Sequence, residues 1–305
     1  MHRTSALVAD KLKAFGVDDI VTGLGRTAML LGAAKYLAEM RNFDGTCVVI
    51  FQPAEEGGGG GKEMVDDGMM EQFSIDEVYG MHNMPGLPLG EFAIRPGAFF
   101  AAADQFEIHV EGKGRHAAKP HETIDTTLVA AHIVMALQSI AARNVNPLHS
   151  VVVSTCTFRT ESEAHNVIPQ HVLLKGTVRT HDADVGDLAE TSLIKLATAT
   201  AEAFGATATV NYTRGYPVMV NSEEQTEFVA GVAAKVSGKD TIHADAIMGG
   251  EDFAYMLEAR PGAYILVGNG DTAMVHHPEY NFDDDVIPAG CSWWAEIIES
   301  RMPAA

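Results

Sequence analysis

The segment QFEIHVEGK, residues 105–113, alternates apolar and polar side chains along its whole length. Side chains on a strand point alternately to the two faces of a sheet, so this pattern predicts a strand with one buried face. After it we expect, in chain order, a helix at 125–143, strands at 150–160 and 171–180, a helix at 184–204 and a strand at 207–215. The resulting order, βαββαβ, is the ferredoxin-like motif.

The sequence on either side of this motif has a different pattern. Helical apolar spacing occurs at 4–15 and 27–40, and short apolar runs that end in polar or glycine residues occur at 46–52, 77–83, 90–97 and 263–270. Such runs are typical of buried strands in α/β sheets, whose functional residues lie at the strand ends. We therefore predict an α/β fold: an α/β-sheet domain made of residues 1–103 and 214–305, with a ferredoxin-like domain, residues 104–213, inserted into it.

Charge and composition exclude several classes of function. The 305 residues include 21 Lys and Arg against 41 Asp and Glu, a formal net charge of −20. Binding to nucleic acid or to an anionic membrane needs a basic surface, so we expect neither partner. The amphipathic N-terminal stretch and the lack of a run near 20 apolar residues favour a cytoplasmic protein. Three widely separated cysteines fit no CxxC motif and no disulfide framework.

An acidic pair lies in the stretch VVIFQPAEEGGGGGKEM, residues 48–64. Glu55 and Glu56 directly follow a predicted strand, where adjacent side chains point in different directions. One carboxylate can therefore bind a metal while the other faces a water molecule. A solvated acidic loop is the simpler alternative for an isolated pair. The five glycines that follow allow a backbone to wrap closely around a site.

Histidines and further carboxylates occur at the ends of other predicted strands. His82 lies in YGMHNMPG, His276 and His277 lie in MVHHPEYNF, and Glu251 and Asp252 follow a glycine pair in MGGEDFAYM. A single histidine is more often structural. Imidazoles and carboxylates gathered at strand ends instead favour a hydrolytic site for Zn²⁺, Mn²⁺ or Co²⁺.

Six segments together make a specific resemblance. They are FQPAEEGGGGGKEMVDDG, YGMHNMPGLPLGEFAIRPG, GKGRHAAKPH, NVIPQHVLLKGTVRT, MGGEDFAYML and HHPEYNF, in this order. In them the chain resembles the metallopeptidase-like family that contains hippurate hydrolases, N-acyl-amino-acid amidohydrolases and indoleacetyl-amino-acid amidohydrolases. The resemblance implies a metal-binding α/β domain with an inserted ferredoxin-like domain that often dimerises. We therefore expect a homodimer formed through the inserted domain.

The resemblance also implies roles for individual residues in the metal centre. Glu55 matches the general base that activates the attacking water, and Glu56, His82 and His276 match metal ligands. His116, in GRHAAKPH, matches a histidine that reaches a neighbouring active site and stabilises the tetrahedral oxyanion, a role that needs a positioned donor.

Three more residues match positions that contact the substrate. Asn166 and Arg179 resemble substrate-binding residues, and a guanidinium is suited to bidentate capture of a substrate carboxylate. Gly250 would let the backbone approach the same carboxylate. Taken singly, each of these residues has a structural alternative, such as a turn former for Asn166 or a solubilising charge for Arg179.

One part of the family pattern is absent. Members carry a Cys-Gly-His-Asp-Gly-His-like segment, preceded by an Arg-Ala-Asp-Met-Asp-like strand, and these supply a bridging cysteine and a histidine ligand. Here FGVDDIVTGLG runs directly into RTAMLLG at Gly25–Arg26. We therefore expect one divalent ion, or weak binding, with Glu56 and His276 completed by water or His277. Cys47 is expected in a buried strand and is no substitute for the thiolate.

Three functions remain open on the sequence. The first is metal-dependent hydrolysis of the amide bond of N-acyl amino acids, small hippurate-like substrates, by a Glu55-activated water. The second is promiscuous cleavage of small esters in a ligand-depleted site, without the GxSxG motif that a serine mechanism would need. The third is a non-catalytic binding or dimerisation relative of the hydrolases.

Overall fold

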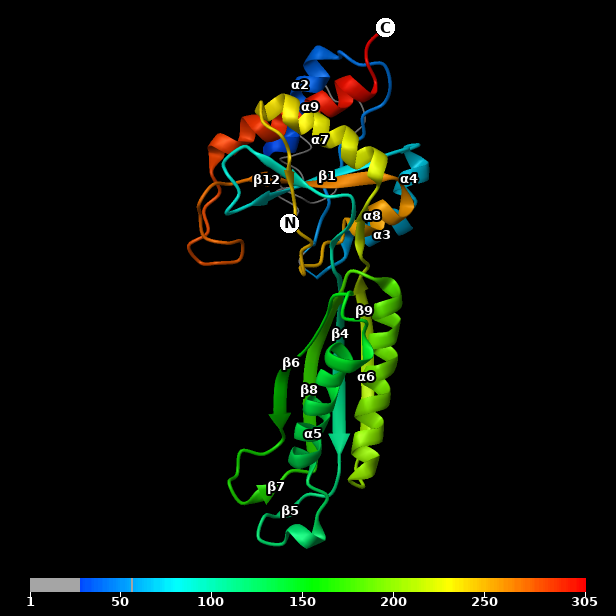
Figure 1. Ribbon diagram of the computed structural model, residues 1–305, viewed down its shortest axis with the longest axis vertical. Helices are drawn as coiled ribbons and strands as arrows, with labels where there is room; N and C mark the ends of the chain where they lie inside the picture. The colour runs from blue at the N-terminus through cyan, green and yellow to red at the C-terminus, as the bar shows by residue number, and fades with distance from the viewer. Residues whose placement is uncertain (1–27, 56) are drawn as a thin grey trace. The chain divides into compact units, whose positions relative to one another are not determined.

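The protein is described by a computed structural model that covers residues 28–55 and 57–305 (Figure 1). The predicted helix at 4–15, the Gly25–Arg26 junction and Glu56 lie outside the described residues. The chain divides into two compact units. We call them the core unit, made of the described residues up to Phe99 with 220–245 and 252–305, and the inserted unit, made of residues 100–219 and 246–251.

The core unit is built on a mixed sheet in the order β1-β12-β2-β11. The strands are β1 (Val78–Met84), β2 (Phe92–Ile94), β11 (Ile242–His243) and β12 (Gly262–Gly268). β1 is parallel to β12, β12 is antiparallel to β2, and β2 is parallel to β11. All seven residues of β12 are buried, as expected for an apolar strand covered on both faces.

Helices cover both faces of this sheet. Figure 1 shows α2 (Ala28–Met40), α7 (Glu223–Ser237) and α9 (Ile287–Arg301) on one face, and α3 (Gly60–Asp66), α4 (Met69–Gln72) and α8 (Ala254–Ala259) on the other. A short 3-10 helix, η3 (Asp284–Val286), leads into α9. Trp293 of α9 is fully buried, stacks on Phe92 with ring centroids 6.4 Å apart, and donates its indole N–H to the carbonyl of Val229 at 3.2 Å. These contacts hold α9 and α7 on the sheet.

The predicted strand at 46–52 is wrong. Its neighbours at 77–83, 90–97 and 263–270 form β1, β2 and β12, but residues 46–52 have no regular secondary structure. A strand exists only as part of a hydrogen-bonded ladder, and this segment pairs with no strand among the described residues. Its apolar side chains still pack, since Phe51 is buried and Val49 lies against it. Apolar pattern alone did not distinguish an extended packed segment from a strand.

The inserted unit has the ferredoxin-like order and topology. Its main elements are β4 (Ala102–Glu111), α5 (Thr126–Ser139), β6 (Val151–Thr160), β8 (His171–Thr180), α6 (Ala183–Ala203) and β9 (Thr207–Tyr216). The sheet order is β6-β8-β4-β9, and every neighbouring pair is antiparallel. The predicted α/β fold class is therefore confirmed, and the elements of this unit follow the expected order βαββαβ.

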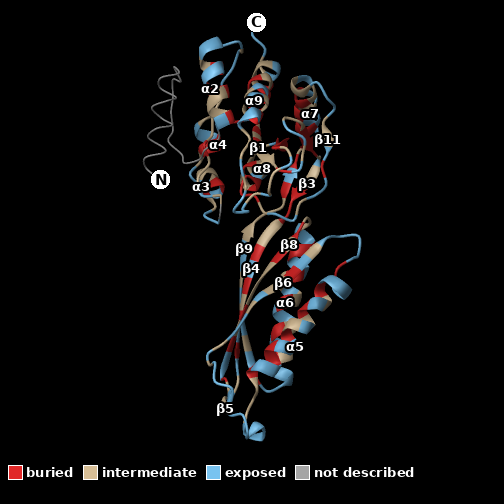
Figure 2. Cartoon of the chain, turned by 90° about the vertical axis from the view of Figure 1, so that its left-hand side faces the viewer, coloured by how far each residue is buried: buried red, intermediate tan, exposed pale blue. Residues whose placement is uncertain are grey.

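Both helices of the inserted unit pack on one face of its sheet (Figure 2). Each begins at an aspartate cap: Asp125 accepts from the amides of Thr127 and Leu128, and Asp182 from those of Asp184 and Val185. These caps satisfy amides that a helix start leaves unpaired.

α5 continues as a π-helical turn, Ile140–Asn144. Residues 126–144 are long and apolar enough to cross a bilayer by length and composition. Ile133 and Leu137 of this helix are fully buried in the unit's core, so the apolarity has a packing role here.

Short elements complete the inserted unit. β5 (Arg115–His116) pairs with β7 (Val167–Ile168) beyond the end of the main sheet, and a 3-10 helix, η1 (Pro120–Glu122), follows β5. β3 (Gly97–Phe100) and β10 (Met219–Asn221) pair in a two-stranded sheet where the chain passes between the units.

The segment 246–251 groups with the inserted unit and not with the flanking domain to which the sequence assigned it. The backbone amide of Ala101 donates to the carbonyls of Ile247 and Gly249 at 3.0 and 2.9 Å. The imidazole of His181 also lies 2.9 Å from the carbonyl oxygen of Ile247. These long-range hydrogen bonds have no signature in the local sequence.

Glu77, just before β1, ties three elements of the core unit together. Its carboxylate accepts from the guanidinium of Arg301, from the Tyr79 hydroxyl at 2.7 Å and from the Gln225 amide at 3.0 Å. Burial alone would raise the pKa of Glu77, but these hydrogen bonds, led by that from Arg301, outweigh it and lower the pKa to about 2.

A depressed carboxylate pKa makes stability depend on pH. The contribution of Glu77 is fully present above the unfolded pKa of about 4.3 and is lost as the pH falls through about 2. We expect Glu77→Gln to lower the unfolding free energy by about 1–3 kcal/mol at pH 7 and by much less at pH 2.5. Urea unfolding at the two pH values measures both. Glu224→Gln, an exposed carboxylate on the same Arg301, is the control, and an equal loss at both pH values would contradict the assignment.

Candidate functional site

The acidic pair follows a tight loop of the core unit. Ala54 adopts a left-handed backbone conformation (φ 53°), and the amides of Gly57 and Gly58 donate to the carbonyls of Glu55 and Ala54 at 2.6 and 2.9 Å. Glu55 is half-buried on this loop. Left-handed conformations are uncommon for residues with a side chain and concentrate at functional loops. The loop is therefore a specific structure and not a solvated acidic run.

Asp252 fixes this loop from both ends. Its carboxylate is fully buried, accepts from the side-chain amide of Gln52 and accepts from the backbone amide of Gly61 at 2.8 Å. A Cβ atom on Gly61 would lie 2.7 Å from the carbonyl oxygen of Asp252. The last glycine of the run is thus needed for close approach of two backbones.

Asp252 has a bracing role that the sequence did not indicate. The GGED pattern was visible, but only the fold shows that this carboxylate braces the loop of Glu55, about 200 residues earlier in the chain. No local signal could have found this pairing.

His82 lies in β1, whose far end carries Asn83 and Met84. Its Nδ1 is 2.6 Å from the carbonyl oxygen of Asn83. An imidazole that donates from Nδ1 to a carbonyl keeps the lone pair of Nε2 for a metal ion, as metal-binding histidines commonly do. The side-chain amide of Asn83 donates to the hydroxyl of Tyr280 at 2.5 Å, which brings the segment that follows His276 to the end of β1.

His276 is exposed and has a left-handed backbone (φ 67°). For an L-residue this conformation costs about 1–2 kcal/mol. The neighbouring His277 is also exposed, and its Nδ1 accepts from the amide of Glu279 at 3.1 Å. The strain singles out His276, and not His277, as the unusual member of the pair.

The metal-binding side chains of the described residues do not gather into one site. Among residues 28–55 and 57–305, no group of three or more His, Cys, Asp or Glu side chains lies close enough to hold one. Glu56, the predicted carboxylate ligand, is outside these residues, so the described part does not by itself form a closed centre. Burial raises the pKa of Cys47 to about 11, so this half-buried side chain stays a thiol at neutral pH and is not prepared as a ligand.

His116 and Asn166 lie together on the inserted unit. His116 of β5 is paired with Val167, and the amide of Ala117 donates to the carbonyl of Asn166 at 2.9 Å. The amide of Ala118 donates to Nδ1 of His116 at 3.1 Å. An imidazole that accepts at Nδ1 carries its proton at Nε2, so His116 presents a donor.

Arg179 and Gly250 lie together at the opposite end of the same unit. Arg179 is near the end of β8, opposite Ala103 of β4. A Cβ atom on Gly250 would lie 2.7 Å from the Cβ of Ala103 and 3.3 Å from the Tyr216 ring. Only glycine therefore fits at position 250 without displacing its neighbours.

The two groups are separated by the length of β8, and Figure 1 shows β5 and β7 beyond one end of that strand. Ten strand residues span about 30 Å, so the four predicted residues make two clusters and not one.

The sequence of this chain matches a family model, "Peptidase family M20/M25/M40", over residues 8–300. That range includes nearly every described residue and both units. The chain belongs to this family. The predicted family is thereby confirmed, and the loop of Glu55, the strand of His82 and the inserted unit all lie within the family match.

Relatives of this peptidase family are similar over most of the chain. A hippurate hydrolase of Campylobacter jejuni is 36% identical over 275 residues, which are 90% of this chain and 71% of the relative. An N-acetyl-L-cysteine deacetylase of Bacillus subtilis is 37% identical over 86% of this chain and 62% of the relative. An IAA-amino acid hydrolase of Arabidopsis thaliana is 36% identical over 95% of this chain and 66% of its own. The chain thus spans about two thirds of these relatives' length.

Solved structures share the fold. A structure from methicillin-resistant Staphylococcus aureus superposes with a TM-score of 0.81 at 30% identity, covering 90% of this chain and 72% of the other. A dinuclear metal-binding peptidase of the M20 family from Bacillus subtilis superposes with a TM-score of 0.75 at 29% identity, covering 88% and 69%.

Proposed function

We propose that this chain hydrolyses the amide bond of N-acyl amino acids. The observation that carries the proposal is the M20 match over residues 8–300, with relatives named for the cleavage of hippurate, N-acetyl-L-cysteine and IAA-amino acid conjugates. Each of these compounds is an amide of an amino acid that keeps its carboxylate. Arg179 supplies the matching cation in this chain, and a guanidinium binds a carboxylate with two parallel hydrogen bonds.

The chain's own residues divide the reaction as follows. Glu55 accepts a proton from the attacking water and passes it to the nitrogen of the leaving amino acid. The Nε2–H of His116 donates to the oxyanion that forms on the acyl carbonyl. Arg179 holds the substrate carboxylate, with Asn166 and Gly250 as further contacts. A divalent Zn²⁺, Mn²⁺ or Co²⁺ ion held by Glu56, His82 and His276 would supply Lewis-acid polarisation.

The arrangement of the inserted unit supports a homodimer. Arg179 and His116 lie at opposite ends of one sheet, too far apart to contact one small substrate from the same chain. If both act on that substrate, His116 must come from a second copy. β6 is an edge strand of this sheet, and exposed apolar side chains on α5 and β6, such as Leu128, Met135 and Phe158, offer a surface for pairing.

Hydrolysis of N-benzoylglycine and of N-acetyl amino acids, with and without a chelator, tests the proposal. We expect amine release that falls at least about tenfold with chelator and returns when Zn²⁺, Mn²⁺ or Co²⁺ is added back. Release of the amino acid that is absent, or that the chelator leaves unchanged, would refute metal-dependent amide hydrolysis. Cleavage of an activated ester without amide cleavage would favour the alternative of an ester hydrolase with a depleted site.

A further inference from the structure

Arg179 is held within the inserted unit through a single nitrogen. Its Nη1 donates to the carbonyl of Val178 at 3.1 Å, to the hydroxyl of Thr177, and to the carbonyl of Asp104 at a longer 3.5 Å. All hydrogen bonds of Arg179 within this unit come from Nη1. The opposite edge of the guanidinium, formed by Nε and Nη2, remains for a ligand. That edge has the parallel N–H pair that a carboxylate binds.

Thr177 links Arg179 to the backbone of β4. The Thr177 hydroxyl accepts from Nη1 and donates to the carbonyl of Asp104 at 2.7 Å. Thr177 and Arg179 are two residues apart on β8, so both side chains point to the open face of the sheet, away from α5 and α6. The carbonyl, the hydroxyl and the guanidinium therefore form one short chain of hydrogen bonds across β4 and β8.

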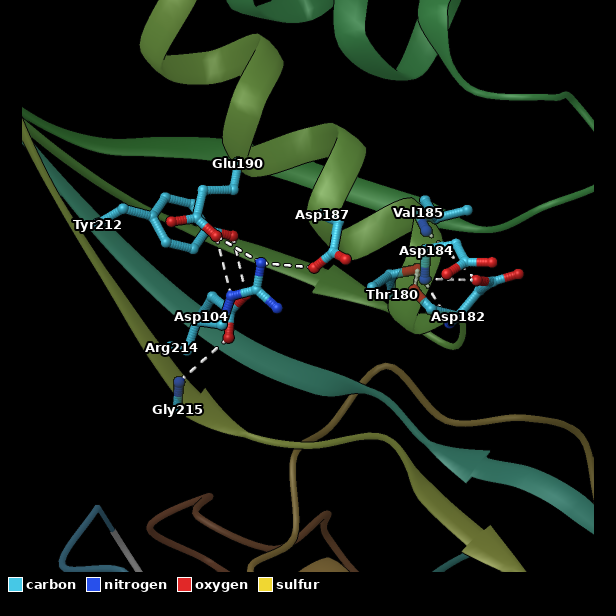
Figure 3. Close-up of polar contacts among 10 residues, drawn as sticks. All are labelled: Asp104, Thr180, Asp182, Asp184, Val185, Asp187, Glu190, Tyr212, Arg214 and Gly215. Atoms are coloured by element: carbon cyan, nitrogen blue, oxygen red, sulfur yellow. Dashed lines mark hydrogen bonds and ion pairs between the residues drawn. The ribbon is translucent and has the colours of Figure 1, made fainter.

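The carbonyl of Asp104 is fixed by the residue's own side chain. The Asp104 carboxylate is buried, accepts from the Tyr212 hydroxyl at 2.8 Å and accepts from the amide of Gly215 at 3.1 Å (Figure 3). Burial, and next the hydrogen bond to Asp104, raise the pKa of Tyr212, so its hydroxyl stays a donor at neutral pH.

The Asp104 carboxylate closes a β-bulge. β4 and β9 pair with a register shift between Ala103 and Gln105, so that two residues of β9, Arg214 and Gly215, lie opposite Asp104. A Cβ atom on Gly215 would lie 2.1 Å from the Ala103 carbonyl oxygen. Figure 3 shows Arg214 turned to α6, where it pairs with Asp187 at 2.6 Å and Glu190 at 2.5 Å. The bulge is therefore anchored to the helix layer as well as to β4.

The bulge also affects the position of Gly250, the second predicted substrate contact, relative to Arg179. Beyond it, Ala103 pairs with Tyr216 on one side and with Arg179 on the other. Gly250 packs on both Ala103 and Tyr216. The position of Gly250 relative to Arg179 thus depends on where the bulge places Ala103 and Tyr216.

We propose that Asp104 and Thr177 are positioning residues that aim the Nε and Nη2 edge of Arg179, and so make the site selective for substrates with an unblocked carboxylate. This inference rests on the proposed function. An arginine side chain loses much of its rotamer freedom when it is immobilised. A guanidinium already fixed at Nη1 has lost that freedom before the substrate arrives. Binding of the carboxylate therefore costs less conformational entropy, and the affinity for the substrate is higher.

The test compares N-benzoylglycine with its primary amide, which has the same shape but no carboxylate. Binding of both to the full chain is measured by calorimetry in a Glu55→Gln background, where turnover is expected to be lost. We expect the acid to bind at least about tenfold tighter than the amide. Adding Thr177→Val, which keeps the shape and removes the hydroxyl, should reduce this ratio to within about twofold.

Three further variants sharpen the result. Thr177→Ser restores the hydroxyl and should restore the ratio. Thr209 lies on the same open face of the sheet, on β9, and has no hydrogen bond to Arg179, Thr177 or Asp104. Thr209→Val should therefore leave the ratio of acid to amide binding unchanged. Asp104→Asn, which keeps the size of the side chain, should weaken binding of the acid more than of the amide. With Glu55 intact, Thr177→Val should raise KM for the acid with little change in kcat.

The failures of the two proposals can be told apart. Absence of N-benzoylglycine hydrolysis with Glu55 intact contradicts the proposed function, while the binding ratio stays measurable by calorimetry. Hydrolysis that persists in the Glu55→Gln background contradicts only the general-base role of Glu55, and the ratio is then measured as a ratio of KM values. A wild-type ratio near one, or a ratio that Thr177→Val leaves unchanged in a protein with normal thermal unfolding, overturns the positioning role.

Discussion

Replacing Glu55 by Gln is expected to lower kcat for N-benzoylglycine by about 10²–10⁴-fold, the usual contribution of a general base. Gln keeps the size of the side chain and its hydrogen-bonding capacity but cannot accept a proton from water. The loop itself should persist, because Asp252 holds it through the side chain of Gln52 and the backbone amide of Gly61. Stopped assays of glycine release, with KM measured in parallel, give the size of the loss.

The matched control is Glu63→Gln, an exposed carboxylate on α3, the helix that the same loop enters. It should retain wild-type turnover. Metal content per chain should be the same in both variants, since Glu55 is assigned to the water and not to the ion. Unchanged turnover of amides and esters in Glu55→Gln would remove the general-base assignment, and a loss of bound metal would move Glu55 to the ligand set.

His116→Ala is expected to lower kcat by about 10²–10³-fold, as removal of an oxyanion donor does. If His116 acts on the active site of the other copy, mixing this variant with Glu55→Gln should restore activity. In a mixed dimer one site combines the intact Glu55 of one chain with the intact His116 of the other. Random pairing of two inactive chains then recovers about one quarter of wild-type turnover.

His121→Ala, an exposed histidine on the same segment of the inserted unit, is the control and should keep full activity. Chains must be mixed under conditions that exchange subunits, with hybrid formation followed by differently tagged chains. Hybrids that form without any recovery would show that His116 serves its own chain or has no catalytic role. A chain that is monomeric at assay concentration would exclude the shared site altogether.

The inserted unit is the part of the fold that local sequence specified most fully. Strict alternation in 105–113 and helical spacing in 125–143 and 184–204 reflect surfaces with one buried side, whose period is the geometry of the element itself. Those elements form as expected, to within a few residues at their ends. In the core unit the buried runs at 77–83 and 263–270 also form strands, but the equally apolar run at 46–52 does not, because its state depends on a partner strand.

The candidate site shows the same division. The motifs identified Glu55, Glu56, His82, His116, Asn166, Arg179, Gly250 and His276 as candidates, and their roles stay predictions. They did not show that His116 with Asn166, and Arg179 with Gly250, make two clusters at opposite ends of one sheet. Asp252, Asp104 and Thr177 were also missed, since each acts on a residue that is distant in the chain or on another strand.

By itself, the sequence determined the α/β class, the βαββαβ motif and the residues able to carry hydrolytic chemistry, because periodicity and residue type are local properties. Only the tertiary structure decided which of these residues meet, that segment 246–251 joins the inserted unit, and that a buried carboxylate closes a bulge beside Arg179. The physical reason is that hydrogen bonds between distant segments form only after the chain has closed long loops, and no short stretch of sequence records its eventual partner.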